Sequence, residues 1–356
     1  MKRKQTGILV CLVVAAMLFQ YCSKSDTIST PTTATTNTNT ETTVFSLLPQ
    51  LPVSPFNYSN VVFPAHIASA LPAQDNTPAT NPVTNDGATL GRVLFYDKNL
   101  SKNNTVSCGS CHRQDLSFSD SAIKSVGFLG GTTDRHSMQL LNVRFYRSGR
   151  MFWDERAATL EDQVLQPIQN TTEMGMTLAE VETKVSGLSY YPSLFQKAFG
   201  TTQVTSDRIS KALAQFVRSI VTYQSKYDQV KQGLATFTVD ERDGETLFLT
   251  AGGNNTCAGC HAPPMFITSN PAGPFSINND AGINGQRRFK SGSLRNIANT
   301  APYFHDGSVG SLQAMLSTNI PAHSVGPQDR AKLLAFLQTL TDVACLTDAK
   351  FSNPFK

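Results

Sequence analysis

The sequence has little of what marks several large classes of protein. No long stretch alternates between apolar and polar residues, so extended β-sheet is not predicted. The net charge is only +4, and no cluster of Lys and Arg forms the basic surface that nucleic-acid binding needs. Without the first 21 residues, 27 Lys and Arg stand against 26 Asp and Glu. This balance predicts a mixed, solvated surface and no nucleic-acid partner.

The first 22 residues have the pattern of a secretory signal. Basic residues 2–4 precede an apolar run, 8–19, that is too short for a comfortable membrane span. Cys22 follows, which predicts a lipoprotein signal with an acylated thiol. Ordinary cleavage and an uncleaved anchor stay open, because Gln20 and Tyr21 are larger than the residues usual before a lipidated Cys. Residues 23–43 are rich in Thr and predict a flexible tether.

Cysteine is scarce outside one repeated pattern. Four of the seven cysteines form two copies of C-x-x-C-H, and the residues that define them are Cys108, Cys111 and His112, then Cys257, Cys260 and His261. Of the other three, Cys11 lies in the signal and Cys22 is the candidate anchor. Cys345 has no obvious partner, so we predict a buried free thiol and no structural disulfide.

The pattern C-x-x-C-H is the attachment site of a c-type haem. Its two thiols add to the vinyl groups of the porphyrin, and the adjacent His becomes the proximal iron ligand. A zinc site would gather four Cys or His ligands in one cluster. A redox dithiol would lie near a βαβ pattern and has no fixed His after it. Two copies favour two covalently bound haem c groups, and covalent haem with a secretory signal predicts the periplasm or cell envelope.

Helical periodicity predicts an all-α protein, and the two haem motifs predict two cytochrome c-like haem domains packed against each other. A short helix is expected over 91–97, and an amphipathic helix around 205–229 has apolar residues at the spacing of one helix face. Gly244, Leu247 and Phe248 precede the second motif much as Gly91, Leu94 and Phe95 precede the first; a further apolar stripe comprises Leu333, Phe336, Leu337 and Leu340. We predict domains at 44–235 and 236–356.

The stretch between the motifs carries a resemblance to a known family. Residues 151–163 read MFWDERAATLEDQ, followed by Pro167-Ile168 and Glu173-Met174-Gly175. A later block contains FK at 289–290, SLRN at 293–296 and TAPYFHDG at 300–307. Together with both haem motifs, these blocks resemble the bacterial di-haem cytochrome c peroxidase family, which includes the MauG-type enzymes. The resemblance covers roughly residues 60–345.

The resemblance implies roles for three residues between the haems. Glu173 matches the family's acid/base on the open face of the first haem, where a carboxylate can carry a proton between the two oxygens of peroxide. Gln163 matches a neighbouring amide that orients peroxide or water. Trp153 matches the aromatic residue between the haems. In isolation these would be a surface acid, a helix residue and a core aromatic.

The sixth ligands of the two haems depart from the family pattern. Many members carry a distal His on the first haem, and the matching segment 128–131 has none. This predicts a first haem that is open without reductive activation, or that is closed by another group; His136, the nearest alternative, aligns better with a family Asn. On the second haem the family's Met or Tyr position falls on Asn319, which leaves Met315 or His323 as candidate ligands.

The family also binds calcium between its domains. Thr300 and Pro302 match two carbonyl donors, whereas His136 stands where the family has an Asn oxygen. Calcium prefers oxygen ligands, so the resemblance leaves one calcium ion open.

The function that these residues predict is reduction of hydrogen peroxide to water. Electrons would come from a small cytochrome c or cupredoxin at the His261 haem, pass Trp153 and reach the His112 haem. Two alternatives stay open: a MauG-like oxidase of another protein or small molecule, and a non-catalytic electron-transfer lipoprotein. The membrane is expected as a partner only through Cys22, and the resemblance is compatible with a homodimer.

Overall fold

The computed structural model describes residues 48–250, 257–268, 280–318 and 323–355. The predicted signal, the Cys22 anchor, the 23–43 tether and Asn319 lie outside these residues. The described part contains helices and isolated β-bridges but no strand, so the all-α prediction is confirmed. Within the same part, no helix has the length and apolar character needed to cross a membrane.

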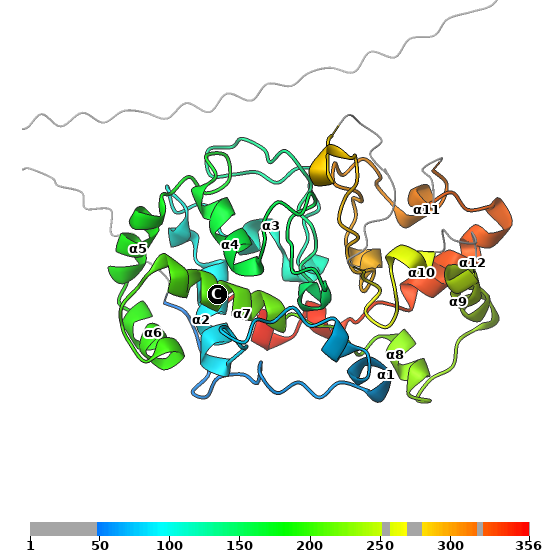
Figure 1. Cartoon of the computed structure of the whole chain (residues 1–356), viewed down its shortest axis with the longest axis horizontal. Coiled ribbons are helices and arrows are strands. Elements are labelled where there is room, and N and C mark those ends of the chain that lie inside the picture. Colours follow the sequence, from blue (N-terminus) through cyan, green and yellow to red (C-terminus); the bar gives the residue numbers. More distant parts are fainter. Residues whose placement is uncertain (1–47, 251–256, 269–279, 319–322, 356) are drawn as a thin grey trace, which may run out of the picture. The chain divides into compact units, whose positions relative to one another are not determined.

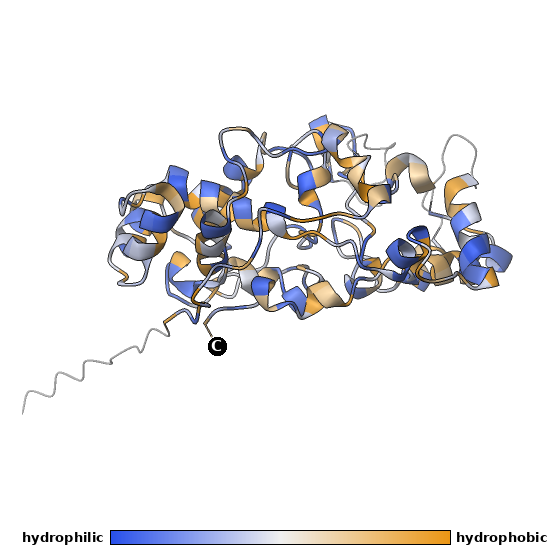
Figure 2. Ribbon diagram, turned by 90° about the horizontal axis from the view of Figure 1, so that it is seen from below, coloured by the Kyte–Doolittle hydropathy of each residue, from blue (hydrophilic) through white to orange (hydrophobic). Residues whose placement is uncertain are grey.

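Twelve α-helices are described, most of them short. They are α1 Ala65–Ala68, α2 Asn85–Tyr96, α3 Cys108–Cys111, α4 Leu160–Gln169, α5 Leu178–Ser186, α6 Tyr191–Phe199, α7 Ser206–Ser219, α8 Lys226–Lys231, α9 Val239–Thr250, α10 Cys257–Cys260, α11 Leu312–Met315 and α12 Pro327–Gln338. Many helices carry hydrophilic and hydrophobic residues side by side, as amphipathic helices do (Figure 2).

α7, the longest of the described helices, forms where the sequence predicts an amphipathic helix. The Thr205 hydroxyl caps it by accepting a hydrogen bond from the Arg208 N–H. Its apolar face is buried: Ile209 and Phe216 are fully covered. Fully burying side chains of this size contributes about 1.5–3 kcal/mol each, which explains why α7 is central to the first core cluster.

The predicted helix around 205–229 ends earlier than its periodicity suggests. α7 stops at Ser219, and α8 begins separately at Lys226. The intervening backbone bonds to Asn142: the Asn142 N–H donates to the Ile220 carbonyl (3.0 Å), and the Thr222 N–H donates to the Asn142 side-chain oxygen (3.1 Å). These tertiary hydrogen bonds replace the ones that would continue the helix.

Two helix pairs cross through a glycine in the same way. α2 packs on α7 and α9 packs on α12, and each pair lies side by side in Figure 1. A Cβ on Gly91 would lie 2.0 Å from the Ala212 carbonyl oxygen, and one on Gly244 would lie 2.1 Å from the Lys332 carbonyl oxygen. Glycine therefore permits a backbone approach that no other residue allows.

Aromatic contacts repeat beside both glycine crossings. Phe95 in α2 meets Phe216 in α7 with ring centroids 5.2 Å apart, and Phe248 in α9 meets Phe336 in α12 at 5.3 Å. In α2 and α9 the Phe lies four residues after the glycine. In α7 and α12 it lies four residues after the residue whose carbonyl faces that glycine. The sequence shows similar Gly and Phe positions before each haem motif. In the structure these positions belong to the same kind of helix pair, which occurs twice.

The two units belong to separate core clusters. The first cluster is centred on α2 and α7, and it also takes Cys345 and Phe351 from the C-terminal segment. The second is centred on α9 and α12, and it takes Tyr227 from α8. The domain boundary between residues 235 and 236 stays a prediction. Cys345 is a buried free thiol among the described cysteines, as expected.

We expect Gly91→Ala to lower the free energy of unfolding by about 1–3 kcal/mol, because the new methyl must displace the α7 backbone. Gly244→Ala should do the same through α12. Gly310→Ala is the matched control, since no atom lies within 4 Å of the added Cβ. Urea unfolding of the holoproteins measures all three, and equal stabilities of Gly91→Ala and Gly310→Ala would contradict the close crossing.

Candidate functional site

The first C-x-x-C-H motif folds as one helical turn. Cys108 and Cys111 begin and end α3, and at its start the Ser107 N–H donates to the Ser110 hydroxyl (3.0 Å). The His112 N–H donates to the Cys108 carbonyl (2.9 Å), which places the imidazole directly after the two thiols. The Nδ1 atom of His112 lies 3.0 Å from the Phe118 carbonyl oxygen. Because a carbonyl only accepts, Nδ1 carries the hydrogen and Nε2 presents its lone pair for a metal.

The second motif repeats this arrangement. Cys257 and Cys260 begin and end α10, and the His261 N–H donates to the Cys257 carbonyl (2.9 Å). The His261 Nδ1–H donates to the Gly292 carbonyl, also over 3.0 Å. Burial, and next the nearby His323, lowers the pKa of His261 to about 4. The imidazole is therefore neutral at pH 7, as an iron ligand must be.

The thiols do not match the pattern of a redox dithiol. Among the described residues, no group of three or more His, Cys, Asp or Glu is placed to hold a metal. Burial raises the pKa of Cys108 to about 12 and that of Cys111 to about 11, whereas redox dithiols depend on a lowered thiol pKa. Two adjacent thiols beside a neutral, oriented imidazole fit a covalent haem at each motif.

Glu173 and Gln163 line one cavity with His112. This first cavity has a volume of about 650 Å³, within the range of small-molecule and cofactor sites. Gln163 comes from α4 and Glu173 from the loop that follows it. The structure thus brings together an imidazole, an amide and a carboxylate that the sequence predicts to face one haem.

The loop carrying Glu173 is fixed by backbone hydrogen bonds. The Asn170 side-chain oxygen accepts from the N–H groups of Thr172 (2.8 Å) and Glu173 (3.1 Å). The Phe128 N–H donates to the Glu173 carbonyl (3.0 Å). Gly127 lies so close that a Cβ there would be 1.7 Å from the Thr172 carbonyl oxygen. The segment where the family's distal His is missing therefore supports the carboxylate's backbone.

The Glu173 carboxyl has a proton affinity suited to acid/base work. Burial raises its pKa above the usual value; Arg156 opposes this shift and Asp134 adds to it. A carboxyl with a raised pKa exchanges a proton more readily near neutral pH than an ordinary surface acid does.

His136 is turned away from a role as an added haem ligand. Its Nδ1 lies 3.0 Å from the Ala122 carbonyl oxygen and its Nε2 lies 3.4 Å from the Ser119 hydroxyl. His136 and His112 both line the first cavity. The open first haem stays a prediction, which this engagement of both His136 nitrogens supports.

Trp153 lines both the first cavity and a second one around His261. Its indole N–H donates to the His136 carbonyl (2.7 Å), and its own carbonyl accepts from the Lys290 N–H (2.8 Å). The aromatic ring is thus fixed in the wall shared by the two predicted haem cavities.

The structure shows a buried polar cluster beside Trp153 that the sequence does not predict. The Lys290 ammonium is 3% exposed, lies 3.8 Å from the centre of the Tyr146 ring and donates to the Arg150 carbonyl (3.0 Å). The Tyr146 hydroxyl donates to the buried Glu155 carboxylate. Burial lowers the pKa of Lys290 to about 7, while Glu155 opposes that shift. A Lys between Phe and Ser gives no sequence signal of burial.

The second cavity holds both candidate sixth ligands. Met315, at the end of α11, and His323 line it together with His261, and His323 meets the Phe304 ring edge-on at 5.5 Å. The arrangement does not separate the two, and Asn319, the position matched by the family's ligand, lies outside the described residues.

The residues matched to the calcium site line this same cavity. Thr300 and Pro302 share it with His136. The His136 imidazole offers no oxygen and already faces Ala122 and Ser119, so this position does not fit a calcium ligand. Calcium stays a prediction of the resemblance.

The fold and the paired motifs define a c-type cytochrome with two haem sites. Residues 85–236 match the sequence profile of the family described as di-haem cytochrome c peroxidase. The cytochrome c551 peroxidase of Nitrosomonas europaea is 35% identical over 283 residues, which cover 74% of this chain and 82% of that protein. The methylamine utilization protein MauG of Methylorubrum extorquens is 32% identical over 290 residues, covering 74% and 80%.

A solved structure agrees with this similarity. The crystal structure of a MauG-like protein associated with microbial copper homeostasis superposes with a TM-score of 0.73 at 28% identity, covering 83% of this chain and 99% of that one. The chain belongs to the di-haem cytochrome c peroxidase family, and two haem c groups follow from that membership.

Replacing Cys257 and Cys260 by Ala should leave one covalent haem per chain instead of two, because only the 108–112 motif can then form thioether bonds. The intact mass and the pyridine haemochrome absorbance measure the haem content. Cys345→Ala is the matched control and should keep both haems, since Cys345 belongs to a core cluster. Two haems retained on the double variant would contradict attachment at this motif.

Proposed function

We propose that this chain is a di-haem peroxidase that reduces hydrogen peroxide to water. The observation that carries the proposal is the shared cavity of His112, Gln163 and Glu173. Simple electron transfer has no use for a half-buried carboxyl of raised pKa in the cavity beside His112. The similarity to the cytochrome c551 peroxidase of Nitrosomonas europaea supports the same reaction.

The residues of the chain divide the work of the reaction. A haem held by Cys108, Cys111 and His112 would supply the iron that binds peroxide and is oxidised by it. Glu173 takes the proton from one peroxide oxygen and returns it to the other, which allows the O–O bond to break with water as the leaving group. Gln163 orients the peroxide through its amide. Two electrons and two protons convert each peroxide into two waters.

Electrons would reach this site through the second haem, held by Cys257, Cys260 and His261. We propose a small cytochrome c or cupredoxin as the donor, and Met315 or His323 as the opposite ligand. Trp153 supports transfer between the haems because its ring lines both cavities. We place the protein in the periplasm or cell envelope, where the predicted signal and Cys22 anchor would hold it through the tether. A homodimer is part of this proposal.

A second candidate is a MauG-like oxidase, in which the oxidised haem would oxidise another protein or small molecule. The similarity to MauG proteins and to the MauG-like structure favours keeping it. Peroxide consumption by purified holoprotein with a reduced one-electron donor separates the two. Turnover supports the peroxidase, and oxidation of an added substrate without donor turnover would support the oxidase. A holoprotein that does neither is an electron carrier.

Glu173→Gln should lower peroxide turnover by about 10²–10⁴ and retain both haems, because the amide keeps the shape but cannot carry the proton. Asp240→Asn, which changes an exposed carboxylate in α9, is the matched control and should keep wild-type turnover. Stopped-flow peroxide consumption measures both variants. Undiminished turnover in Glu173→Gln would remove this residue from the reaction.

The pH dependence of kcat/KM for peroxide should show an acid limb set by Glu173. Only the ionised carboxylate accepts a proton, so activity rises as the pH rises through the raised pKa of Glu173. Arg156→Gln should move the limb to higher pH, because the Arg156 charge lowers this pKa. Glu173→Gln should lack the limb, and a limb that does not respond to Arg156→Gln would assign it to another group.

A further inference from the structure

One ion pair near the second haem motif is completely buried. The Arg295 guanidinium bonds both oxygens of Asp228, over 2.7 and 2.8 Å, and both side chains are 0% exposed. Removing two charges from water costs several kcal/mol per ion, and the pair's attraction often only offsets that cost. Such a pair is better explained by what it orients than by the stability that it adds.

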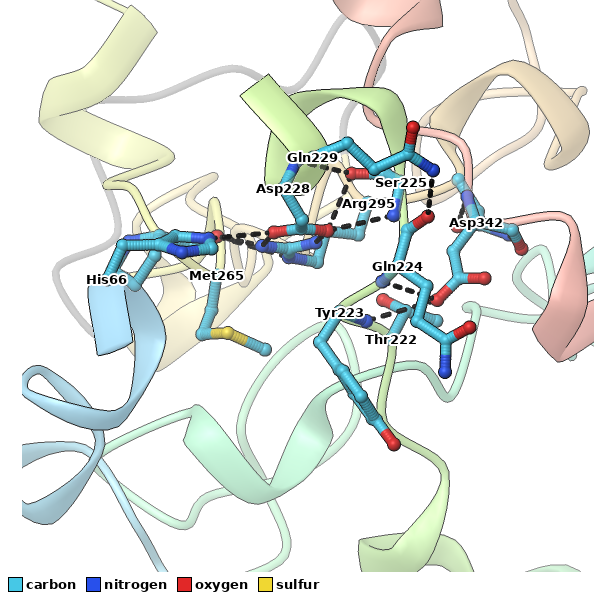
Figure 3. Close-up of polar contacts among 12 residues, drawn as sticks. His66, Thr222, Tyr223, Gln224, Ser225, Asp228, Gln229, Met265, Arg295 and Asp342 are labelled. Atoms are coloured by element: carbon cyan, nitrogen blue, oxygen red, sulfur yellow. Dashed lines mark hydrogen bonds and ion pairs between the residues drawn. The ribbon is translucent and has the colours of Figure 1, made fainter. Parts of the chain in front are cut away.

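The Asp228 carboxylate also accepts hydrogen bonds from the start of its own helix and from α1 (Figure 3). The Ser225 N–H and hydroxyl donate to it over 2.9 and 2.7 Å, which fixes the start of α8. His66, in α1 near the N-terminal end of the described chain, contacts it through Nε2 at 3.0 Å. The carboxylate is therefore held from three directions.

Arg295 also fastens the chain that follows His261. Its Nε and Nη2 atoms donate to the Pro264 carbonyl, over 3.1 and 2.7 Å. The neighbouring residues add parallel bonds: the Ser293 hydroxyl donates to the Met265 carbonyl (2.7 Å). The segment around Arg295 and the segment after the second haem motif are thus joined side by side.

The carbonyl that orients His261 belongs to this fastened segment. Gly292, whose oxygen accepts from the His261 Nδ1–H, lies three residues before Arg295. The first haem site differs: the acceptor for His112 is Phe118, only six residues away along the chain. The acceptor for His261 is 31 residues away, so only tertiary contacts can hold it in place.

We propose that Arg295 and Asp228, with His66, are positioning residues for the proximal ligand of the second haem. They fix the Gly292 carbonyl, which fixes the hydrogen bond and the plane of the His261 imidazole. A strong Nδ1–H bond makes the imidazole a stronger donor to iron and so stabilises ferric over ferrous haem. The inference rests on haem attachment at His261; its consequence for electron delivery rests on the proposed function.

The test compares the two haems in one molecule. Asp228→Asn should loosen Arg295 and raise the midpoint potential of the second haem, with altered EPR g-values, while the first haem keeps its potential. Asp228→Glu keeps the charge but displaces the carboxylate, so positioning predicts a shift here as well, whereas a pure charge effect predicts none. His66→Phe, which keeps a ring but removes the donor, should give a smaller shift confined to the second haem.

Glu161→Gln is the matched control, because it weakens another carboxylate–guanidinium pair, between the half-buried Glu161 and the buried Arg218, that does not contact the His261 segment. It should leave the second haem unchanged. If neither Asp228 variant assembles with both haems, His66→Phe decides. An unchanged potential and spectrum of the second haem in the variants that assemble would overturn the proposal, as would an equal shift in Glu161→Gln. Because the readout is spectroscopic, an inactive wild type would contradict the proposed function without touching this inference.

Discussion

A single hydrogen bond, from the Nδ1–H of an imidazole to a backbone carbonyl, fixes each predicted proximal His, and the surrounding structure holds the acceptor in place. The bond leaves Nε2 free to bind iron, whereas a rotated ring would bury a lone pair against a carbonyl oxygen. At His112 the acceptor is Phe118, and at His261 it is Gly292. Each one-turn helix bearing the thiols contributes by hydrogen-bonding the backbone N–H of the same His.

The two haem sites share a scaffold but not their surroundings. A glycine crossing with a Phe pair beside it occurs once in each core cluster, which explains why both sites need the same helix pair. Between the cavities the repetition ends. Trp153 is held there by the His136 carbonyl and the Lys290 N–H, and Glu173 and Gln163 line the first cavity but are not among the described residues that line the second. This difference supports dividing peroxide chemistry and electron delivery between the sites.

Residues whose chemistry depends on local spacing could be predicted from the sequence. The two haem motifs and the buried face of α7 are of this kind, because a turn of helix determines both. The early end of α7 could not be predicted, since Asn142 lies far away in sequence and competes for the backbone of Ile220 and Thr222. The burial of Lys290 and Asp228 is equally invisible, because their partners come from distant segments. Glu173 was predicted as a site residue through a family resemblance, and its partial burial and raised pKa emerge only from packing.

Each His and its acceptor are separated by a different number of residues along the chain, and this difference has a thermodynamic consequence. Closing a loop of 31 residues instead of six costs about 1.5 kcal/mol more chain entropy. The first proximal pocket is thus nearly a property of its own short stretch of chain. The second exists only once chain segments far apart in sequence have come together, so its order depends on the tertiary contacts between them.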